Sequence, residues 1–74
     1  MSHAAMRDVV GKFVVSTARN EGLHFVGKHY ETVVFDDGRE CGGRIYRKSR
    51  QAEIGHRRIV ADVEAHPENY TPVY

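Results

Sequence analysis

The feature that most constrains the fold is one helical pattern, from Ser49 to Ala65, in a chain whose earlier segments favour strands. Positions suited to burial recur at i, i+4, i+7, i+8 and i+11 and form one stripe of a helix: Ala52, His56, Ile59, Val60 and Val63. Ser49 is suited to cap the helix N-terminus, and Pro67 ends the helix. Gly55 lies on the same stripe and costs about 1 kcal/mol of helix propensity relative to alanine. We therefore expect the helix backbone to approach a sheet closely at Gly55.

Three segments before this helix have the composition of strands. Residues 12–18 (KFVVSTA) are rich in β-branched side chains, and residues 29–35 (HYETVVF) carry apolar side chains on both faces. The sequence Asp36-Asp37-Gly38 is a strong tight-turn signal. Residues 40–43 form a poor strand and predict a longer or bulged connection before residues 44–46 resume pairing.

Two further segments are ambiguous. Residues 6–10 fit either a short helix or an early extension of the first strand, with Gly11 as a break or bulge. Residues 23–26 fit either the start of a return strand or a loop packed on the core.

These elements predict an α+β fold: a small antiparallel three-stranded sheet with one C-terminal helix packed on one face. The length of 74 residues allows a single domain, residues 1–74, with one small core. We expect that core at about residues 12–66, and flexible or partner-binding ends at residues 1–5 and 67–74.

Four residues are predicted to have structural roles: Glu31, Thr32, Gly55 and His56. On the helical stripe His56 faces the sheet, where its ring could donate a hydrogen bond to Glu31 or Thr32. A catalytic base is the alternative role for this histidine. We also expect four apolar side chains to be buried together: Val33, Phe35, Ile59 and Val63.

The net charge of +1 conceals a basic block in the middle of the chain. Residues 39–58 hold seven basic and two acidic side chains, whereas residues 59–74 hold three acidic and no Lys or Arg side chains. Such a block is typical of an anion-binding surface and equally of a solvated helix start. With 41% hydrophobic and 28% charged residues and no long apolar run, the composition favours a folded globular domain and predicts no membrane partner.

Enzymatic and metal-binding patterns are weak. Cys41 is the single cysteine, so no internal disulfide is possible and a reducing compartment is the expected one. Cys41, His56 and Glu31 could in principle form a nucleophile, a base and an orienting carboxylate, but no phosphate loop or oxyanion hole is visible. The spacing of the histidines and the cysteine matches no compact zinc motif. We therefore predict no enzyme activity, no cofactor and no metal.

Three pieces of the chain form a further pattern: Val15-Ser16-Thr17, the run Tyr30 to Phe35 (YETVVF) with Tyr46, and Ala52-Glu53-Ile54-Gly55-His56 followed by Val60 and Val63. Across about residues 15–63 this pattern resembles a family of short uncharacterised proteins of bacteriophages and prophages. The resemblance implies a phage origin and this architecture, and no catalytic residues. The chain departs from the family at the helix start, which is basic here (Lys48-Ser49-Arg50-Gln51), and in the dozen residues before the first strand.

The leading functional hypothesis is a small phage accessory or structural protein that acts by protein–protein binding without catalysis, forms a homo-oligomer, and resides in the host cytoplasm or the virion. The C-terminal residues suited to a partner's groove or strand edge are Tyr70, Val73 and Tyr74. The alternative hypothesis is a small nucleic-acid-binding module that uses the basic segment 44–58. Its candidate surface consists of Arg44, Tyr46, Arg47, Lys48, Arg50, Arg57 and Arg58.

Overall fold

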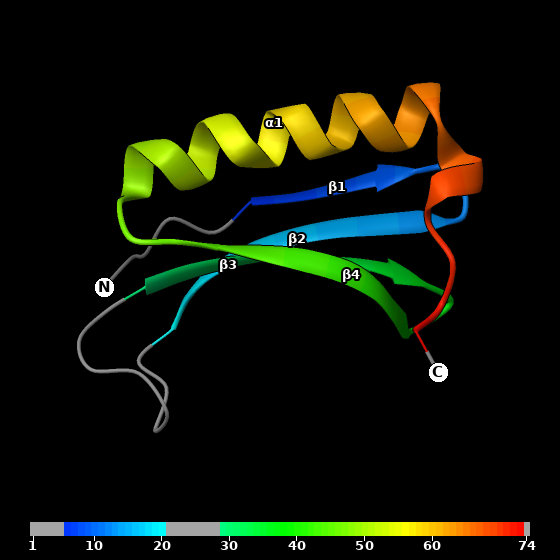
Figure 1. The fold of residues 1–74 in the computed structure, drawn as a ribbon, viewed down its shortest axis with the longest axis horizontal. Coiled ribbons are helices and arrows are strands. Elements are labelled where there is room, and N and C mark those ends of the chain that lie inside the picture. The colour runs from blue at the N-terminus through cyan, green and yellow to red at the C-terminus, as the bar shows by residue number, and fades with distance from the viewer. Residues whose placement is uncertain (1–5, 21–28, 74) are drawn as a thin grey trace.

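A four-stranded antiparallel sheet with one helix along one face makes up the part of the protein that the structure describes (Figure 1). The computed structural model describes residues 6–20 and 29–73. The strands are adjacent in chain order, and the elements are β1 (Met6–Val10), β2 (Phe13–Asn20), β3 (His29–Asp36), β4 (Arg39–Tyr46), the helix α1 (Ser49–Ala65) and a short 3-10 helix η1 (Pro67–Asn69). The α+β class, the antiparallel sheet and the single C-terminal helix on one face are therefore as predicted.

The sheet has four strands, so the prediction of three was wrong. Residues 6–10 form β1, which pairs with β2 so that Asp8 lies opposite Val15 and Val10 opposite Phe13. Gly11 supplies the turn between the two strands with a positive φ of 60°. The sheet thus begins at Met6, before the expected core of residues 12–66. Residues 23–26 lie outside the described residues.

The hairpin between β3 and β4 uses the predicted tight turn. Asp37 and Gly38 both have positive φ angles, 52° and 80°, as a two-residue turn matched to the strand twist requires. Pairing resumes at once at Arg39, not at residue 44 as expected, and the weak strand sequence is accommodated by a bulge at Cys41. A Cβ atom on Gly43 would lie 2.5 Å from the backbone oxygen of Thr32, so glycine lets the two strands pair here.

The core lies between the sheet and α1. Its fully buried apolar side chains are Phe13, Val15, Val34, Ala52 and Val63. The expectation that Val33 and Phe35 join Val63 was wrong, because Thr32 and Val34 are the β3 residues that face the helix. Val33 and Phe35 are half-buried on the opposite face, and Ile59 packs partly buried at the edge of the core.

The helix has the predicted bounds, but its cap differs from the expectation. The N-cap position is Lys48, not Ser49, and it makes no side-chain capping hydrogen bond. At the other end the backbone N–H of His66 donates to the carbonyl of Asp62 at 2.7 Å, and Pro67 starts η1. The described residues contain no helix whose length and hydropathy would let it cross a membrane.

Candidate functional site

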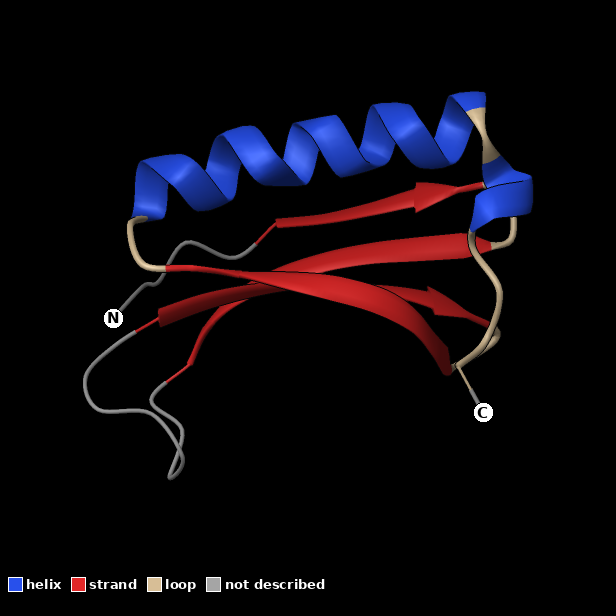
Figure 2. Cartoon of the chain, viewed as in Figure 1, coloured by secondary structure: helices blue, strands red, loops and turns tan. Residues whose placement is uncertain are grey.

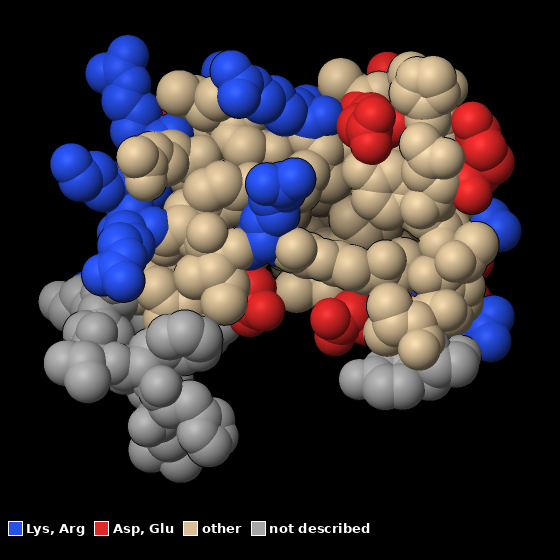
Figure 3. Space-filling view, in the orientation of Figure 1, with Lys and Arg blue, Asp and Glu red and all other residues tan. Residues whose placement is uncertain are grey.

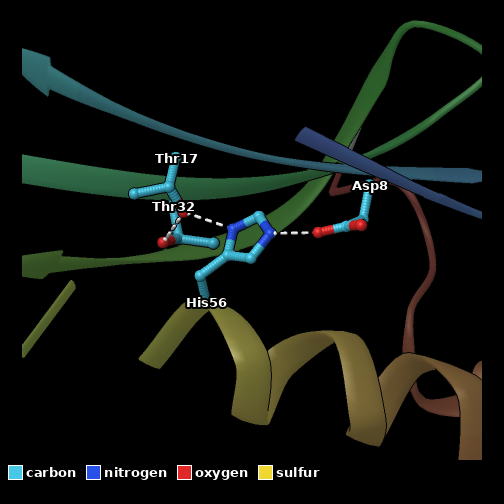
Figure 4. Close-up of polar contacts among 4 residues, drawn as sticks. All are labelled: Asp8, Thr17, Thr32 and His56. Carbon is cyan, nitrogen blue, oxygen red and sulfur yellow. Dashed lines mark hydrogen bonds and ion pairs between the residues drawn. The ribbon is translucent and has the colours of Figure 1, made fainter. Parts of the chain in front are cut away.

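A hydrogen-bonded network of polar side chains runs through the interior between the sheet and α1 (Figure 4). His56 on α1 is fully buried, with its Nδ1 atom 2.6 Å from Thr17 Oγ1 and its Nε2 atom 2.7 Å from Asp8 Oδ2. Thr17 is also hydrogen-bonded to Thr32 on the neighbouring strand. Because a carboxylate only accepts, Nε2–H donates to Asp8. When the ring is neutral, this leaves Nδ1 to accept from Thr17, and the Thr17 oxygen then accepts from Thr32. One network therefore links β3, β2, α1 and β1.

This network contains an acid, a histidine and a hydroxyl, but its geometry keeps the hydroxyls from a substrate. Thr17 and Thr32 are buried, 2% and 0% exposed, and both ring nitrogens of His56 are engaged inside the protein. A nucleophile has to reach the atom that it attacks. The network is suited to holding the helix on the sheet. His56 was expected to bond Glu31 or Thr32. Its direct partners are Thr17 and Asp8, and Glu31 lies on the other face of β3, opposite Ile45.

Cys41 does not form a nucleophile–base pair with His56, because that ring already has two partners. Burial raises the pKa of the Cys41 thiol above its ordinary value, and the nearby Asp36 carboxylate raises it further. A raised pKa lowers the thiolate fraction and with it the reactivity of the sulfur. The Cys41 thiol donates to the backbone carbonyl of Arg39, with the sulfur 3.6 Å from the oxygen.

No cluster of three or more His, Cys, Asp or Glu side chains suited to a metal ion occurs within residues 6–20 and 29–73. His24 lies outside this part of the chain. His66 pairs instead with its neighbour Glu68, with 3.5 Å between Nδ1 and Oε2.

A groove of about 710 Å³ lies between α1 and β4 and is visible as a hollow in Figure 3. Its lining includes two arginines and two tyrosines from separate elements: Arg44 and Tyr46 of β4, Arg58 of α1, and Tyr70 after η1. Gln51 and Ile54 line the helix side. The hollow therefore combines cations, aromatic rings and an amide.

Tyr46 and Gly55 determine the shape of this groove. A Cβ atom on Gly55 would lie 2.1 Å from the Tyr46 hydroxyl oxygen and 2.2 Å from the adjacent ring carbon. The Tyr46 ring thus occupies the space that any larger helix residue would need. The predicted close approach at Gly55 is confirmed, and its partner is a side chain of β4.

The structure brings three of the seven predicted anion-binding residues together in the groove: Arg44, Tyr46 and Arg58. The others are exposed outside it: Arg47, Lys48, Arg50 and Arg57. Figure 3 shows Lys and Arg side chains gathered at the end of the molecule where β4 leads into α1, and Asp and Glu side chains around the opposite end of the helix. Neither Arg44 nor Arg58 lies within 4 Å of a carboxylate oxygen of the described residues.

The C-terminal segment packs against its own domain. The Tyr70 ring meets Phe13 edge-to-face at 6.3 Å between centroids, and its hydroxyl donates to Asp62 Oδ2 at 2.6 Å. Burial, together with this bond to a carboxylate, raises the pKa of Tyr70 to about 12. The backbone N–H of Val73 donates to the carbonyl of Glu40 at the outer edge of β4, while the Val73 side chain is 57% exposed. Tyr74 lies outside the described residues.

The face of the sheet opposite α1 is uncovered by any described element (Figure 2). Apolar side chains from all four strands lie on this face: Val9, Val14, Val33, Phe35 and Ile45. Val9 and Ile45 are 70% and 49% exposed, and the other three are half-buried. We call these five residues the open face.

Sequence reasoning missed Asp8 and Thr17 of the interior network. Thr17 could have been found, because it continues the alternation of Phe13 and Val15 toward the helix. Asp8 gave no signal, because a carboxylate between apolar positions argues against a buried strand face. Gln51, Ile54 and Asp62 of the groove were also missed, since their place there depends on how the helix is rotated against β4.

No protein-family model matches the sequence, and no curated protein and no solved structure matches it either.

Proposed function

We propose that this chain is a non-catalytic accessory or structural protein of a phage that acts by protein–protein binding, and that its partner is a second copy of itself. The observation that carries the proposal is the open face, where every strand contributes an apolar side chain. Uncovered apolar patches of this kind are typical of binding surfaces, because solvent exposure of a contiguous patch is unfavourable. The phage origin in this proposal comes from the resemblance to short phage proteins.

The size of the open face suits a small homodimer. Three strands of eight residues and one of five form it, so it spans about 19 Å across the strands and about 26 Å along them. Two such faces in contact bury on the order of 1,000 Å², at the lower end of specific interfaces. Packing two sheets face to face is also a common way to complete a core.

The charges at the rim favour a second copy over an unrelated partner. Arg7 lies on this face at the β1 edge, and Glu40, opposite Phe35, lies at the β4 edge. A two-fold axis parallel to the strands places β1 of one copy over β4 of the other. Each Arg7 then lies over the edge that carries Glu40 of the second copy. The charges at the two edges of the open face are therefore complementary between two copies.

Light scattering of the full chain at tens of micromolar, roughly where weak homo-oligomers still associate, tests this proposal. We expect a dimeric mass that Ile45→Lys converts to a monomeric mass. Ile54→Lys is the matched control, because Ile54 is 45% exposed but lies on the helix, away from the open face. Circular dichroism confirms that each variant is folded, and Val9→Lys replaces Ile45→Lys if that variant does not fold.

Two results overturn the proposal. One is a monomeric mass for the unmodified chain over the whole concentration range. The other is equal loss of association in Ile45→Lys and Ile54→Lys. That result would mean that the dimer contact lies elsewhere, or that any added positive charge weakens association.

A further inference from the structure

We infer that the groove between α1 and β4 binds single-stranded nucleic acid, with a phosphate held between Arg44 and Arg58 and a base stacked on Tyr46. The inference goes beyond the proposed function and uses a different face of the molecule. The groove opens between the helix and the edge of the sheet, whereas the open face lies on the far side of the sheet. Either conclusion can therefore fail without the other.

The two arginines provide the phosphate site. Arg44 reaches the groove from β4 and Arg58 from α1, so guanidinium groups approach one hollow from two sides. Neither has a carboxylate within ion-pair distance among the described residues, so no ion pair in that part of the chain occupies the two guanidinium groups. Guanidinium groups bind phosphate oxygens through paired N–H donors. Two converging arginines are thus suited to one phosphodiester.

The aromatic and amide groups provide a site for a base. Tyr46 is half-buried against Gly55, and that contact limits where its ring can lie beside the arginines. Stacking on such a ring is worth roughly 1–3 kcal/mol per base and tolerates any base. Gln51 on the helix side adds an amide that can bond a base edge. The volume of about 710 Å³ is within the range of about 300–1,000 Å³ that small ligands occupy.

The charge around the groove indicates a strand, not a lone nucleotide. The exposed cations Arg47, Lys48 and Arg50 continue the positive surface beyond the groove, at the end where β4 leads into α1 (Figure 3). Asp62 lines the same groove one helical turn after Arg58, toward the C-terminal end of α1, and its carboxylate, which accepts from Tyr70, repels a phosphate there. A bound strand therefore leaves the groove toward the basic end. Duplex DNA is not expected to enter, because its bases are already stacked in pairs.

Fluorescence anisotropy with a labelled oligothymidylate of about 12 nucleotides tests the inference, starting at about 50 mM salt. We expect saturable binding that Arg58→Gln weakens about tenfold, because it removes a charge-assisted phosphate contact. The matched control is Arg57→Gln, which removes the same charge from the next helix residue but not from the groove, and should weaken binding by less than about twofold. Tyr46→Phe should keep the affinity, and Tyr46→Ala should lose at least about fivefold.

Binding should also depend on salt in a predictable way. Removal of one phosphate contact should reduce the slope of log affinity against log salt by about 0.7 for a single strand. Arg58→Gln is expected to show this reduction and Arg57→Gln a smaller one. Circular dichroism verifies the fold of each variant, and Arg44→Gln is the second test of the same site if Arg58→Gln is unfolded.

Four outcomes overturn the inference. They are no binding at low salt, equal effects of Arg57→Gln and Arg58→Gln, duplex DNA binding at least as tightly as the single strand, and thymidine monophosphate binding as tightly as the oligonucleotide. Equal effects of the two arginine variants would indicate diffuse electrostatic attraction. Equally tight binding of thymidine monophosphate would indicate a pocket for one nucleotide that makes no contacts with the rest of a strand.

Discussion

The Nε2 atom of His56 lies 2.7 Å from the Oδ2 atom of Asp8, so one hydrogen bond joins the helix to the first strand across 48 residues of sequence. The imidazole is fully buried, whereas the Asp8 side chain is 53% exposed. The bond therefore extends from the interior of the core to its surface at the β1 edge. On the inner side of the ring, the polar chain ends at two buried threonines.

The order of the hydroxyls in this chain predicts unequal costs for two isosteric substitutions. Thr17→Val removes a group that bonds both His56 and Thr32, and it leaves both without that partner in the core. We expect it to lower the free energy of unfolding by about 1–3 kcal/mol. Thr32→Val removes only the terminal hydroxyl, which bonds Thr17 alone in this network, so it should cost less, about 1 kcal/mol. Urea unfolding of both variants measures the difference, and a larger cost for Thr32→Val would contradict the central place of Thr17 in the network.

Neighbouring valines of β3 should differ because they face opposite sides of the sheet. Val34 is 1% exposed under the helix, and Val33 is half-buried on the open face. Val34→Ala should cost about 2–3 kcal/mol in unfolding free energy through lost burial and a residual cavity, and Val33→Ala less than about 1 kcal/mol. Thermal or urea unfolding at a concentration where both variants are monomeric compares them. Equal costs would place the core on both faces.

The same strand shows what sequence reasoning could not determine. Residues 29–35 carry apolar side chains on both faces, so their alternation does not indicate which face the helix covers. That choice is made by the register with β2, which puts Val34 beside Val15 and Thr32 beside Thr17. The helix was predictable because its stripe, its length and its proline stop agree. The face of β3 against which it packs was not.

The residues of the groove and of the interior network were also only partly predictable from the sequence. Arg44, Tyr46 and Arg58 belong to the predicted basic segment, and the fold of β4 against α1 brings them to one groove. Asp8 could not be predicted, because β1 is short and its carboxylate interrupts the apolar face. Its position on β1 is explained only by the tertiary structure, in which the buried ring of His56 contacts its carboxylate. Local patterns thus located the candidate residues, and tertiary contacts selected among them.

Gly55 and Tyr46 should be energetically coupled. Gly55→Ala places a methyl group within 2.1 Å of the present Tyr46 hydroxyl position, so the ring has to move. In the Tyr46→Ala background that conflict is absent, and Gly55→Ala should stabilise the fold by about 1 kcal/mol through helix propensity. In the unmodified chain the gain should be absent or reversed. A double-mutant cycle by thermal unfolding measures the coupling, and additive effects would show that Tyr46 does not rest on Gly55.

Tyr70 predicts a loss of stability at high pH. Burial and the bond to Asp62 raise its pKa in the folded state from 10.0 to about 12. The unfolded chain therefore releases this proton first, so the stabilisation is fully present below pH 10 and is lost as the pH rises through about 12.

Tyr70→Phe keeps the edge-to-face contact with Phe13 but should remove this part of the pH dependence. Asp62→Asn keeps a hydrogen-bond acceptor without the charge, so it should reduce the dependence without removing it. Urea unfolding at several pH values between 9 and 12 measures the free energy of unfolding of both variants and of the unmodified chain. Subtracting the value for the unmodified chain at each pH cancels the titration of lysines and other tyrosines. If Tyr70→Phe shows the same slope as the unmodified chain, the Tyr70 hydroxyl is not held by Asp62, and the C-terminal segment is not anchored at this point.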